Sequence, residues 1–248
     1  MSEDFYVGYD PKCPPGLTRF LRARVTALLV GCAAIAVVLA TAARPLGSGN
    51  FAYGTVRDFE GRILEKPYPI LAVMRPGRAV PAWSYYPLVG RGKHGADPEV
   101  AGLDGRMVHL KGTLIHRDAS TMVELMARPA AAGEAVGGVD PVIDHGIVTV
   151  IGEIVDGKCH LGVMNPGEGQ THRACAVRCI SGGAPPLLVT RDSTGGAMRY
   201  LLVDENDQPL GKRVLDLIAV PVRVTGRTWS RGDLAFLSAA PSTIERIR

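Results

Sequence analysis

The chain begins with one long apolar segment and then changes to short apolar segments with a period of two. Residues 25–43 form a run of nineteen residues without a charged side chain, bounded by Arg24 and Arg44. At about 1.5 Å per residue, a helix of this length spans about 28 Å, which is close to the hydrocarbon thickness of a bilayer. The pattern therefore predicts one transmembrane helix at residues 25–44, preceded by a tail of residues 1–24.

Charges on the two flanks of this segment predict its orientation. Four basic residues lie close to its N-terminal side, whereas Arg44 on the other side is followed by no charge until Arg57. The positive-inside rule then places the N-terminus in the cytoplasm and the C-terminal domains in the periplasm, so we expect a single-pass protein of the inner (cytoplasmic) membrane. A cleaved signal peptide is the alternative, because Ala40-Thr41-Ala42 imitates a cleavage site, but the apolar run exceeds the usual signal core of about 7–15 residues.

Two regions downstream of this helix repeat each other. Positions 86–89 (Tyr-Pro-Leu-Val) and 200–203 (Tyr-Leu-Leu-Val) lie 114 positions apart, and the same offset pairs Gly112 with Gly226. Earlier in the two regions the offset changes from 91 to 116 positions, so the second copy carries about 25 extra residues between its first two apolar segments. A constant offset on each side of one insertion predicts a duplicated module.

Each region has the pattern of a small β-barrel. Runs of β-branched and apolar residues, bounded by Gly, Asp, Asn and Pro, predict the order β-β-β-α-β-β. Their alternation at period two gives each strand one apolar face, as a barrel wall requires. The expected strands are 56–65, 70–75, 83–89, 107–116 and 121–126 in the first region, with a short helix at 98–103, and 147–155, 186–191, 198–203, 220–228 and 234–239 in the second region, with a short helix at 210–219.

One motif within these strands resembles a known fold family. Val222–Gly226 has the pattern Val-x-Val-x-Gly, echoed at Val108–Gly112, and it resembles the fourth strand of OB-fold domains. The sequence therefore predicts a mainly β protein in which one transmembrane helix is followed by two tandem OB-like five-stranded barrels. We expect the barrels at residues 50–128 and 146–248, joined by a flexible linker at 129–145.

Composition supports folded domains and argues against one class of partner. Hydrophobic residues make up 46% of the chain, which is enough for real cores. Beyond residue 44 the chain holds 23 basic and 21 acidic residues, and aromatic residues make up only 6% of the whole sequence. Nucleic-acid binding through OB-like barrels needs basic grooves with stacking aromatics, so no nucleic-acid partner is expected.

The extra residues of the second region, 157–182, concentrate cysteine and histidine. On a helix, His172, Cys175 and Cys179 stand at positions i, i+3 and i+7 and share one face, and Cys159 at the end of the preceding strand can fold toward them. Thiols outside the cytoplasm tend to pair, so a structural disulfide from Cys159 to Cys175 or Cys179, with no cofactor, is the first expectation.

A metal site is the alternative for the same residues. Cys159, His172, Cys175 and Cys179 are of the types that bind zinc tetrahedrally, although the spacing lacks the Cys-x-x-Cys pair of a zinc knuckle. Zinc or another metal would then be the cofactor. A redox-active thiol pair is a further reading of the three cysteines.

The insertion also resembles a group of proteins. Cys159, a glycine-rich loop, His172, Cys175 and Cys179 before the second strand are similar to a pattern in exported bacterial OB-like domains, and the resemblance covers mainly residues 147–240. Membrane-anchored members with tandem domains look like accessory subunits of membrane redox complexes. The resemblance implies integral membrane subunits as partners, and a cytochrome or a soluble electron carrier as a further one.

The anchor and the tail carry the expected contacts with such partners. Small residues four positions apart allow two helices to approach closely in lipid, and the tail is more apolar than an ordinary solvated tail. The residues concerned are Phe5, Tyr6, Tyr9, Ala27, Gly31, Ala36 and Ala40. Because no set of residues in the sequence matches a catalytic constellation, the leading hypothesis is a non-catalytic, membrane-anchored accessory subunit of a respiratory or electron-transfer complex. The alternative is a periplasmic metal-binding or thiol-redox protein.

Overall fold

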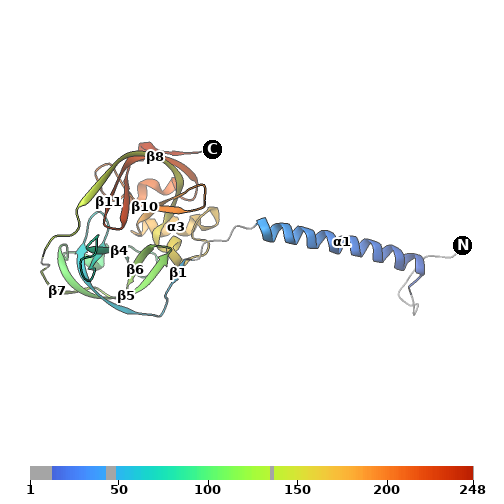
Figure 1. The fold of residues 1–248 in the computed structure, drawn as a ribbon, viewed down its shortest axis with the longest axis horizontal. Coiled ribbons are helices and arrows are strands. Elements are labelled where there is room, and N and C mark those ends of the chain that lie inside the picture. Colours follow the sequence, from blue (N-terminus) through green and yellow to red (C-terminus); the bar gives the residue numbers. More distant parts are fainter. Residues whose placement is uncertain (1–12, 43–48, 135–136, 248) are drawn as a thin grey trace. The chain divides into compact units, whose positions relative to one another are not determined.

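The computed structural model describes residues 13–42, 49–134 and 137–247. The chain divides into two compact units, residues 1–46 and 47–248. The first unit contains a long helix, α1 (Pro15–Ala42), and the second contains the strands (Figure 1).

Helix α1 is the one helix in the described residues that is long and apolar enough to cross a membrane, judged by length and composition. An 18-residue window of it has a mean hydropathy of 2.2, and none of that window is buried. The helix begins at Pro15, ten residues ahead of the predicted apolar run. Arginine is a good helix former and proline is tolerated in a first helical turn, so the basic segment before residue 25 continues the same helix.

The first barrel has five strands that close on themselves. In order of pairing they are β2 (Arg57–Leu64), β3 (Ile70–Met74), β4 (Trp83–Val89), β6 (Ser120–Leu125) and β5 (Arg106–Arg117), which pairs again with β2. Strands β4 and β6 run parallel, and the other neighbours are antiparallel. A short helix, α2 (Asp97–Val100), joins β4 to β5, and the short strands β1 (Asn50–Phe51) and β7 (Ala130–Glu134) add to β5.

The second barrel repeats this topology. Its closed path is β8 (Val142–Asp156), β9 (Pro186–Arg191), β10 (Ala197–Val203), β12 (Leu234–Ser238) and β11 (Pro221–Arg231), with β10 and β12 parallel. The turn η3 (Gly211–Leu217) takes the place of α2, and η4 (Pro241–Thr243) and β13 (Ile244–Arg246) follow the barrel. The predicted fold class, two tandem OB-like barrels after an apolar helix, is confirmed.

The largest difference between the barrels lies after their first strands. Five residues separate β2 from β3, whereas residues 157–185 separate β8 from β9. This insertion holds the helical turns η1 (Cys159–Val163) and η2 (Gln170–His172) and the helix α3 (Arg173–Ser181).

The segment expected as a linker has more structure than its composition indicated. Strand β7 pairs with β5, and β8 begins within the segment, at Val142. Asp140 accepts hydrogen bonds from the backbone N–H of Ala82 (3.0 Å) and of Trp83 (3.1 Å) and from the hydroxyl of Tyr85 (3.0 Å). Small residues suit a flexible linker and an edge strand equally, so only the partner strand distinguishes the two.

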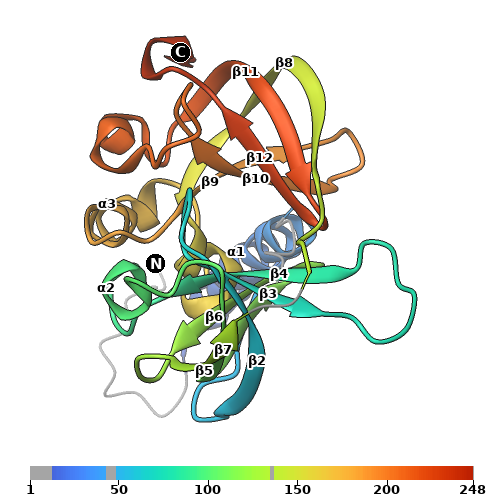
Figure 2. The ribbon, with the colours of Figure 1, turned by 90° about the vertical axis from the view of Figure 1, so that its left-hand side faces the viewer.

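The two barrels share one hydrophobic core. Ile115 and Met122 of the first barrel belong to the same buried cluster as Leu187 and Phe236 of the second. Residues between β2 and β3 add to this interface, because the buried hydroxyl of Tyr68 donates to the carbonyl of Leu202 at 2.5 Å. Figure 2 shows the barrels against each other, with α2 and α3 on the same side.

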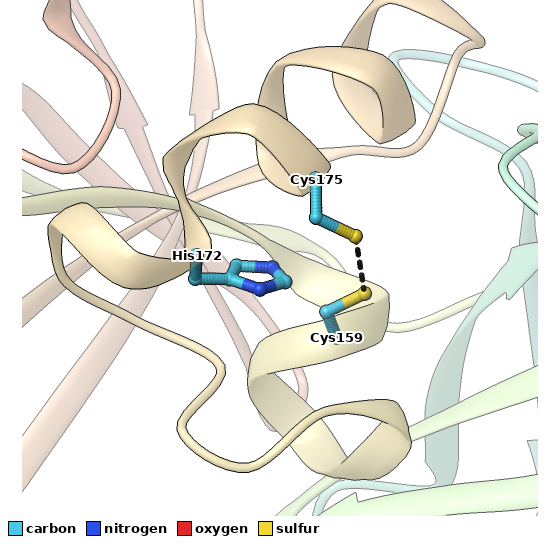
Figure 3. A group of neighbouring side chains, drawn as sticks. All are labelled: Cys159, His172 and Cys175. Carbon is cyan, nitrogen blue, oxygen red and sulfur yellow. Dashed lines mark hydrogen bonds between the residues drawn. The ribbon is translucent and has the colours of Figure 1, made fainter.

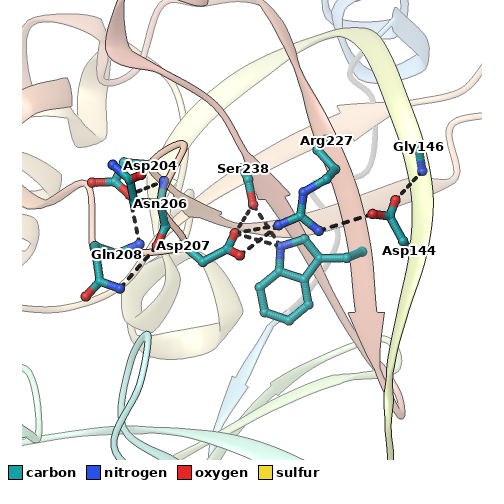
Figure 4. A network of polar contacts seen from close by, with 9 residues as sticks. Asp144, Gly146, Asp204, Asn206, Asp207, Gln208, Arg227 and Ser238 are labelled. Carbon is teal, nitrogen blue, oxygen red and sulfur yellow. Dashed lines mark hydrogen bonds and ion pairs between the residues drawn. The ribbon is translucent and has the colours of Figure 1, made fainter.

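A polar network holds the turn between β10 and η3 against the second barrel. The carboxylate of Asp207 accepts hydrogen bonds from Arg227 (2.7 Å), from the indole of Trp229 (3.2 Å) and from the hydroxyl of Ser238 (Figure 4). Asp204 closes the same turn by accepting the backbone N–H of residues 206 and 208. The charged side chains of this network are all paired with one another or with the backbone.

Candidate metal centre

The first part of the centre is built where β8 ends. Asp156 is its last residue and is fully buried, and its Oδ1 accepts the backbone N–H of Cys159 at 2.8 Å. This hydrogen bond caps the start of η1 in the way that aspartate caps a helix. It fixes the position of the Cys159 thiol, which is 3% exposed.

Helix α3 brings two further cysteines to this thiol. Cys175 and Cys179 lie one turn apart on α3, and the Sγ of each is 3.9 Å from the Sγ of Cys159. All three are free thiols. Two sulfurs bound to one zinc at about 2.3 Å in a tetrahedron stand about 3.8 Å apart, whereas a disulfide bond measures about 2.05 Å. The sulfur separations therefore suit a shared metal ion.

His172 supplies a nitrogen with a defined role. Its Nε2 lies 2.7 Å from Oδ2 of Asp156, and both side chains are buried. A carboxylate only accepts, so Nε2 carries the hydrogen and Nδ1 of the neutral ring presents a lone pair. That Nδ1 is buried and has no hydrogen-bond partner among the described residues. An Asp-His pair that leaves the second ring nitrogen free is the usual support of a metal-binding histidine.

The ligand atoms form two overlapping groups of three. In one, the ligand atoms of Cys159, His172 and Cys175 lie within 4.8 Å of one another (Figure 3). In the other group, the ligand atoms of Asp156, Cys159 and Cys179 also lie within 4.8 Å of one another. Cys159 belongs to both groups and is therefore central. The four residues predicted from the sequence as metal ligands are thus divided between two groups that share Cys159, and Asp156 is a further member of the second group.

The loop that follows β4 in the first barrel closes the site. Lys93 Nζ lies 2.7 Å from Sγ of Cys175, and the backbone N–H of Gly95 donates to the carbonyl of Gly182 at 2.9 Å. Gly182 ends α3, and an added Cβ there would overlap the carbonyl oxygen of Lys93. Only a glycine at this position lets the two backbones approach so closely.

A buried ion pair holds the same loop. Lys158 Nζ donates to the carbonyls of Gly90 (2.8 Å) and Gly92 (2.6 Å) and pairs with Oε2 of Glu124 at 2.8 Å. Lys158 precedes Cys159, while Glu124 belongs to β6. The centre therefore depends on both barrels.

The electrostatics of the thiols follow from these contacts. The hydrogen bond with Cys159 lowers the pKa of the Cys179 thiol, and Lys93 lowers it further. The same hydrogen bond raises the pKa of Cys159, and burial adds to that effect. The hydrogen bond to Cys175 raises the pKa of Lys93, which favours its charged form. Negative charge on the sulfur atoms of α3 is the state that binds a cation.

Sequence reasoning missed Lys93, Lys158, Glu124 and Asp156. Asp156 had a usable signal, because it directly follows a strand and lies three residues before Cys159. The other three had none, since lysine and glutamate are usually solvated surface residues.

The residues predicted to contact partners fall in two places. Phe5, Tyr6 and Tyr9 lie outside the residues that the structure describes. Ala27, Gly31, Ala36 and Ala40 are all exposed on α1. A disulfide from Cys159 stays a prediction, and so do the partners. Comparison with protein-family models, curated proteins and solved structures gives no match to this chain.

Proposed function

We propose that this protein is a membrane-anchored, non-catalytic subunit whose second barrel holds one structural metal ion of the zinc class. Cys159, His172, Cys175 and Cys179 are the proposed ligands. The single observation that carries the proposal is the buried Nδ1 of His172, which has no hydrogen-bond partner among the described residues and stands in a group with the free thiols of Cys159 and Cys175.

The closed character of the site supports a structural role. Cys159, His172 and Cys179 are each at most 3% exposed, and Cys175 is half-buried and contacts Lys93. Catalytic zinc sites keep one position for water or substrate, whereas structural sites are enclosed by four protein ligands. A metal here would join β8 to α3 beneath a loop of the first barrel, and so would stabilise the arrangement of the two barrels.

The membrane part of the proposal is supported by α1. The helix is exposed, its apolar part follows the basic residues Arg19, Arg22 and Arg24 of its first turns, and this favours a single-pass anchor in the inner membrane with its N-terminus in the cytoplasm. The barrels would then lie in the periplasm beside integral membrane subunits of a redox complex. Protease access in spheroplasts tests this orientation. Protection of the barrels in intact spheroplasts would contradict it.

Metal analysis tests the centre. The full chain, purified from membranes in a non-ionic detergent, is expected to carry about one equivalent of zinc or a similar ion. His172→Gln and Cys179→Ser are expected to lose most of it, while His109→Gln and Cys32→Ser are matched controls because those side chains lie on the exposed face of β5 and on α1. Unchanged metal content in His172→Gln would refute the ligand set. A metal-free protein with Cys159 in a disulfide to Cys175 or Cys179 would favour the structural disulfide over the metal.

A further inference from the structure

A second histidine on the insertion has the opposite hydrogen-bonding state to His172. His160 lies beside Cys159 in η1 and is fully buried. The Nε–H of Arg199 lies 3.1 Å from His160 Nε2. Arginine only donates, so Nε2 must accept and Nδ1 must carry the hydrogen. This Nδ1–H is buried without a hydrogen-bond acceptor among the described residues, since Oε2 of Glu168 is 3.7 Å away.

Arg117 adds two more donors that lack acceptors. It ends β5, is 6% exposed, and its Nε and Nη2 atoms are buried with no hydrogen-bond partner in the described part of the chain. It lies on the same face of β5 as Ile115, whose side chain is in the core shared by the barrels, and β5 packs against η1. Arg199 links the two residues, because its guanidinium donates to His160 and to the carboxylate of Asp118, which directly follows Arg117.

The neighbouring carboxylates are already engaged. Both oxygens of Glu168 accept from Arg191 at 2.6 Å, and Asp118 accepts from Arg199 at 2.7 Å. Arg191 and Arg199 therefore have carboxylate partners. The guanidinium of Arg117 has no ion-pair or hydrogen-bond partner for its Nε and Nη2 atoms among the described residues.

We propose that Arg117 and His160 form a binding site for a small oxyanion, the carboxylate or phosphate group of a ligand. An unpaired buried charge costs several kcal/mol, and donors without acceptors add to that cost. A guanidinium matches the two oxygens of a carboxylate or phosphate. A bound anion would accept hydrogen bonds from Arg117 Nε and Nη2 and from His160 Nδ1, and it would compensate the unpaired charge of Arg117. The two histidines of the insertion are thus prepared for opposite partners, His172 for a cation and His160 for an anion.

A cleft beside this cluster has room for the rest of the ligand. A cavity of about 590 Å³ opens between the barrels, and Arg199, Asp118 and Leu161 line one part of it. Arg199 is the hydrogen-bond donor to His160, Asp118 follows Arg117, and Leu161 follows His160. The lining also includes the apolar side chains of Met122, Met198 and Leu234, together with the paired charges of Arg75 and Asp233. The ligand class that fits is an acid with an apolar body.

Thermal unfolding of the full chain in non-ionic detergent tests this site, with inorganic phosphate, acetate, octanoate and octyl phosphate as probes. Octanoate, octyl phosphate or both are expected to raise Tm at millimolar concentration, and which of them does so identifies the anionic group. Arg117→Met keeps an unbranched, flexible side chain and removes the charge. It should weaken binding about tenfold or more. Arg78→Met is the matched control, because Arg78 is exposed on the loop between β3 and β4.

A second readout does not depend on the choice of probe. Without any anion, Arg117→Met should raise Tm, because it removes an unpaired buried charge. A lower Tm in Arg117→Met would show that a protein group already satisfies the guanidinium, and it would overturn the proposal. The absence of a shift with all four probes, or equal shifts in Arg117→Met and in the parent protein, would overturn it as well.

Discussion

Lys158 and Glu124 form a buried ion pair between the two barrels, with Nζ and Oε2 2.8 Å apart and side-chain exposures of 3% and 11%. Both charges are removed from water, so each depends on the other. Removing one partner of such a pair leaves an uncompensated charge.

Glu124→Ala should therefore lower the free energy of unfolding by about 3–5 kcal/mol. The double variant Glu124→Leu with Lys158→Met should be more stable than Glu124→Ala, because it leaves no buried charge behind. Denaturant unfolding of the full chain in detergent measures both. Equal losses in the single and double variants would mean that the pair acts through packing rather than charge.

Tyr68 is a second connection between the two barrels, and removing its hydroxyl should cost less stability than removing Glu124. Its hydroxyl donates to the carbonyl of Leu202 and accepts the backbone N–H of Leu210 at 3.3 Å. Tyr68→Phe leaves both buried backbone groups unsatisfied and should cost about 1–3 kcal/mol of unfolding free energy. Tyr53→Phe is the control, because Tyr53 is 84% exposed. If Tyr68→Phe loses no more stability than Tyr53→Phe, the two backbone groups find other hydrogen-bond partners.

Much of this architecture could be predicted because it depends on local patterns. Both ends of strand β9 were predicted correctly, because Pro185 and Pro186 mark its start and Asp192 follows its last residue. Strand β8 begins five residues earlier than predicted, at Val142 rather than at residue 147. Its extra residues are exposed and pair with the end of β11 beyond a bulge. Because neither face of this part of the strand is buried, its sequence does not alternate between apolar and polar residues.

The candidate centre was predictable only in part for a similar reason. Cysteine and histidine are rare enough that their clustering in one insertion is informative from sequence alone. The loop that closes the site lies more than sixty residues earlier, in the other barrel, and no spacing rule connects Lys93 with Cys175. Such contacts depend on how the barrels pack, which a periodicity does not encode.

Gly182 offers a direct test of that loop. An alanine there would overlap the carbonyl oxygen of Lys93, although the φ of −85° suits any residue. Gly182→Ala should cost about 1–3 kcal/mol through overpacking, and should expose Cys175 to thiol reagents by displacing Lys93. Gly138→Ala is the control, because nothing lies within 4 Å of its added Cβ. If Cys175 reacts at the same rate in both variants, the loop does not cover the thiol.

Metal removal should destabilise the second barrel. At a free zinc concentration about a thousand times the dissociation constant, binding to the folded state alone adds about 4 kcal/mol. A chelator should therefore lower Tm, and added zinc should restore it. In Cys159→Ser both treatments should have little effect, because Cys159 belongs to both groups of ligand atoms. If the chelator leaves the Tm of the parent protein unchanged, this result would contradict a structural metal.

The pH dependence of the free energy of unfolding should show the protonation of His160. Burial, and then the charges of Arg117, Arg199 and Arg191, lower its pKa from 6.5 to about 3, and Glu168 lies too far from it to form a hydrogen bond. Because the folded pKa lies below the unfolded one, the unfolded state binds the proton first, and stability is lost as pH falls from about 6.5 toward 3. Between pH 7.5 and pH 5 this loss amounts to about 2 kcal/mol. His160→Gln should remove that part of the slope when unfolding is measured in piperazine buffers, which carry no carboxylate or phosphate. If the parent protein and His160→Gln lose stability in parallel over this range, His160 is not held neutral in the folded state.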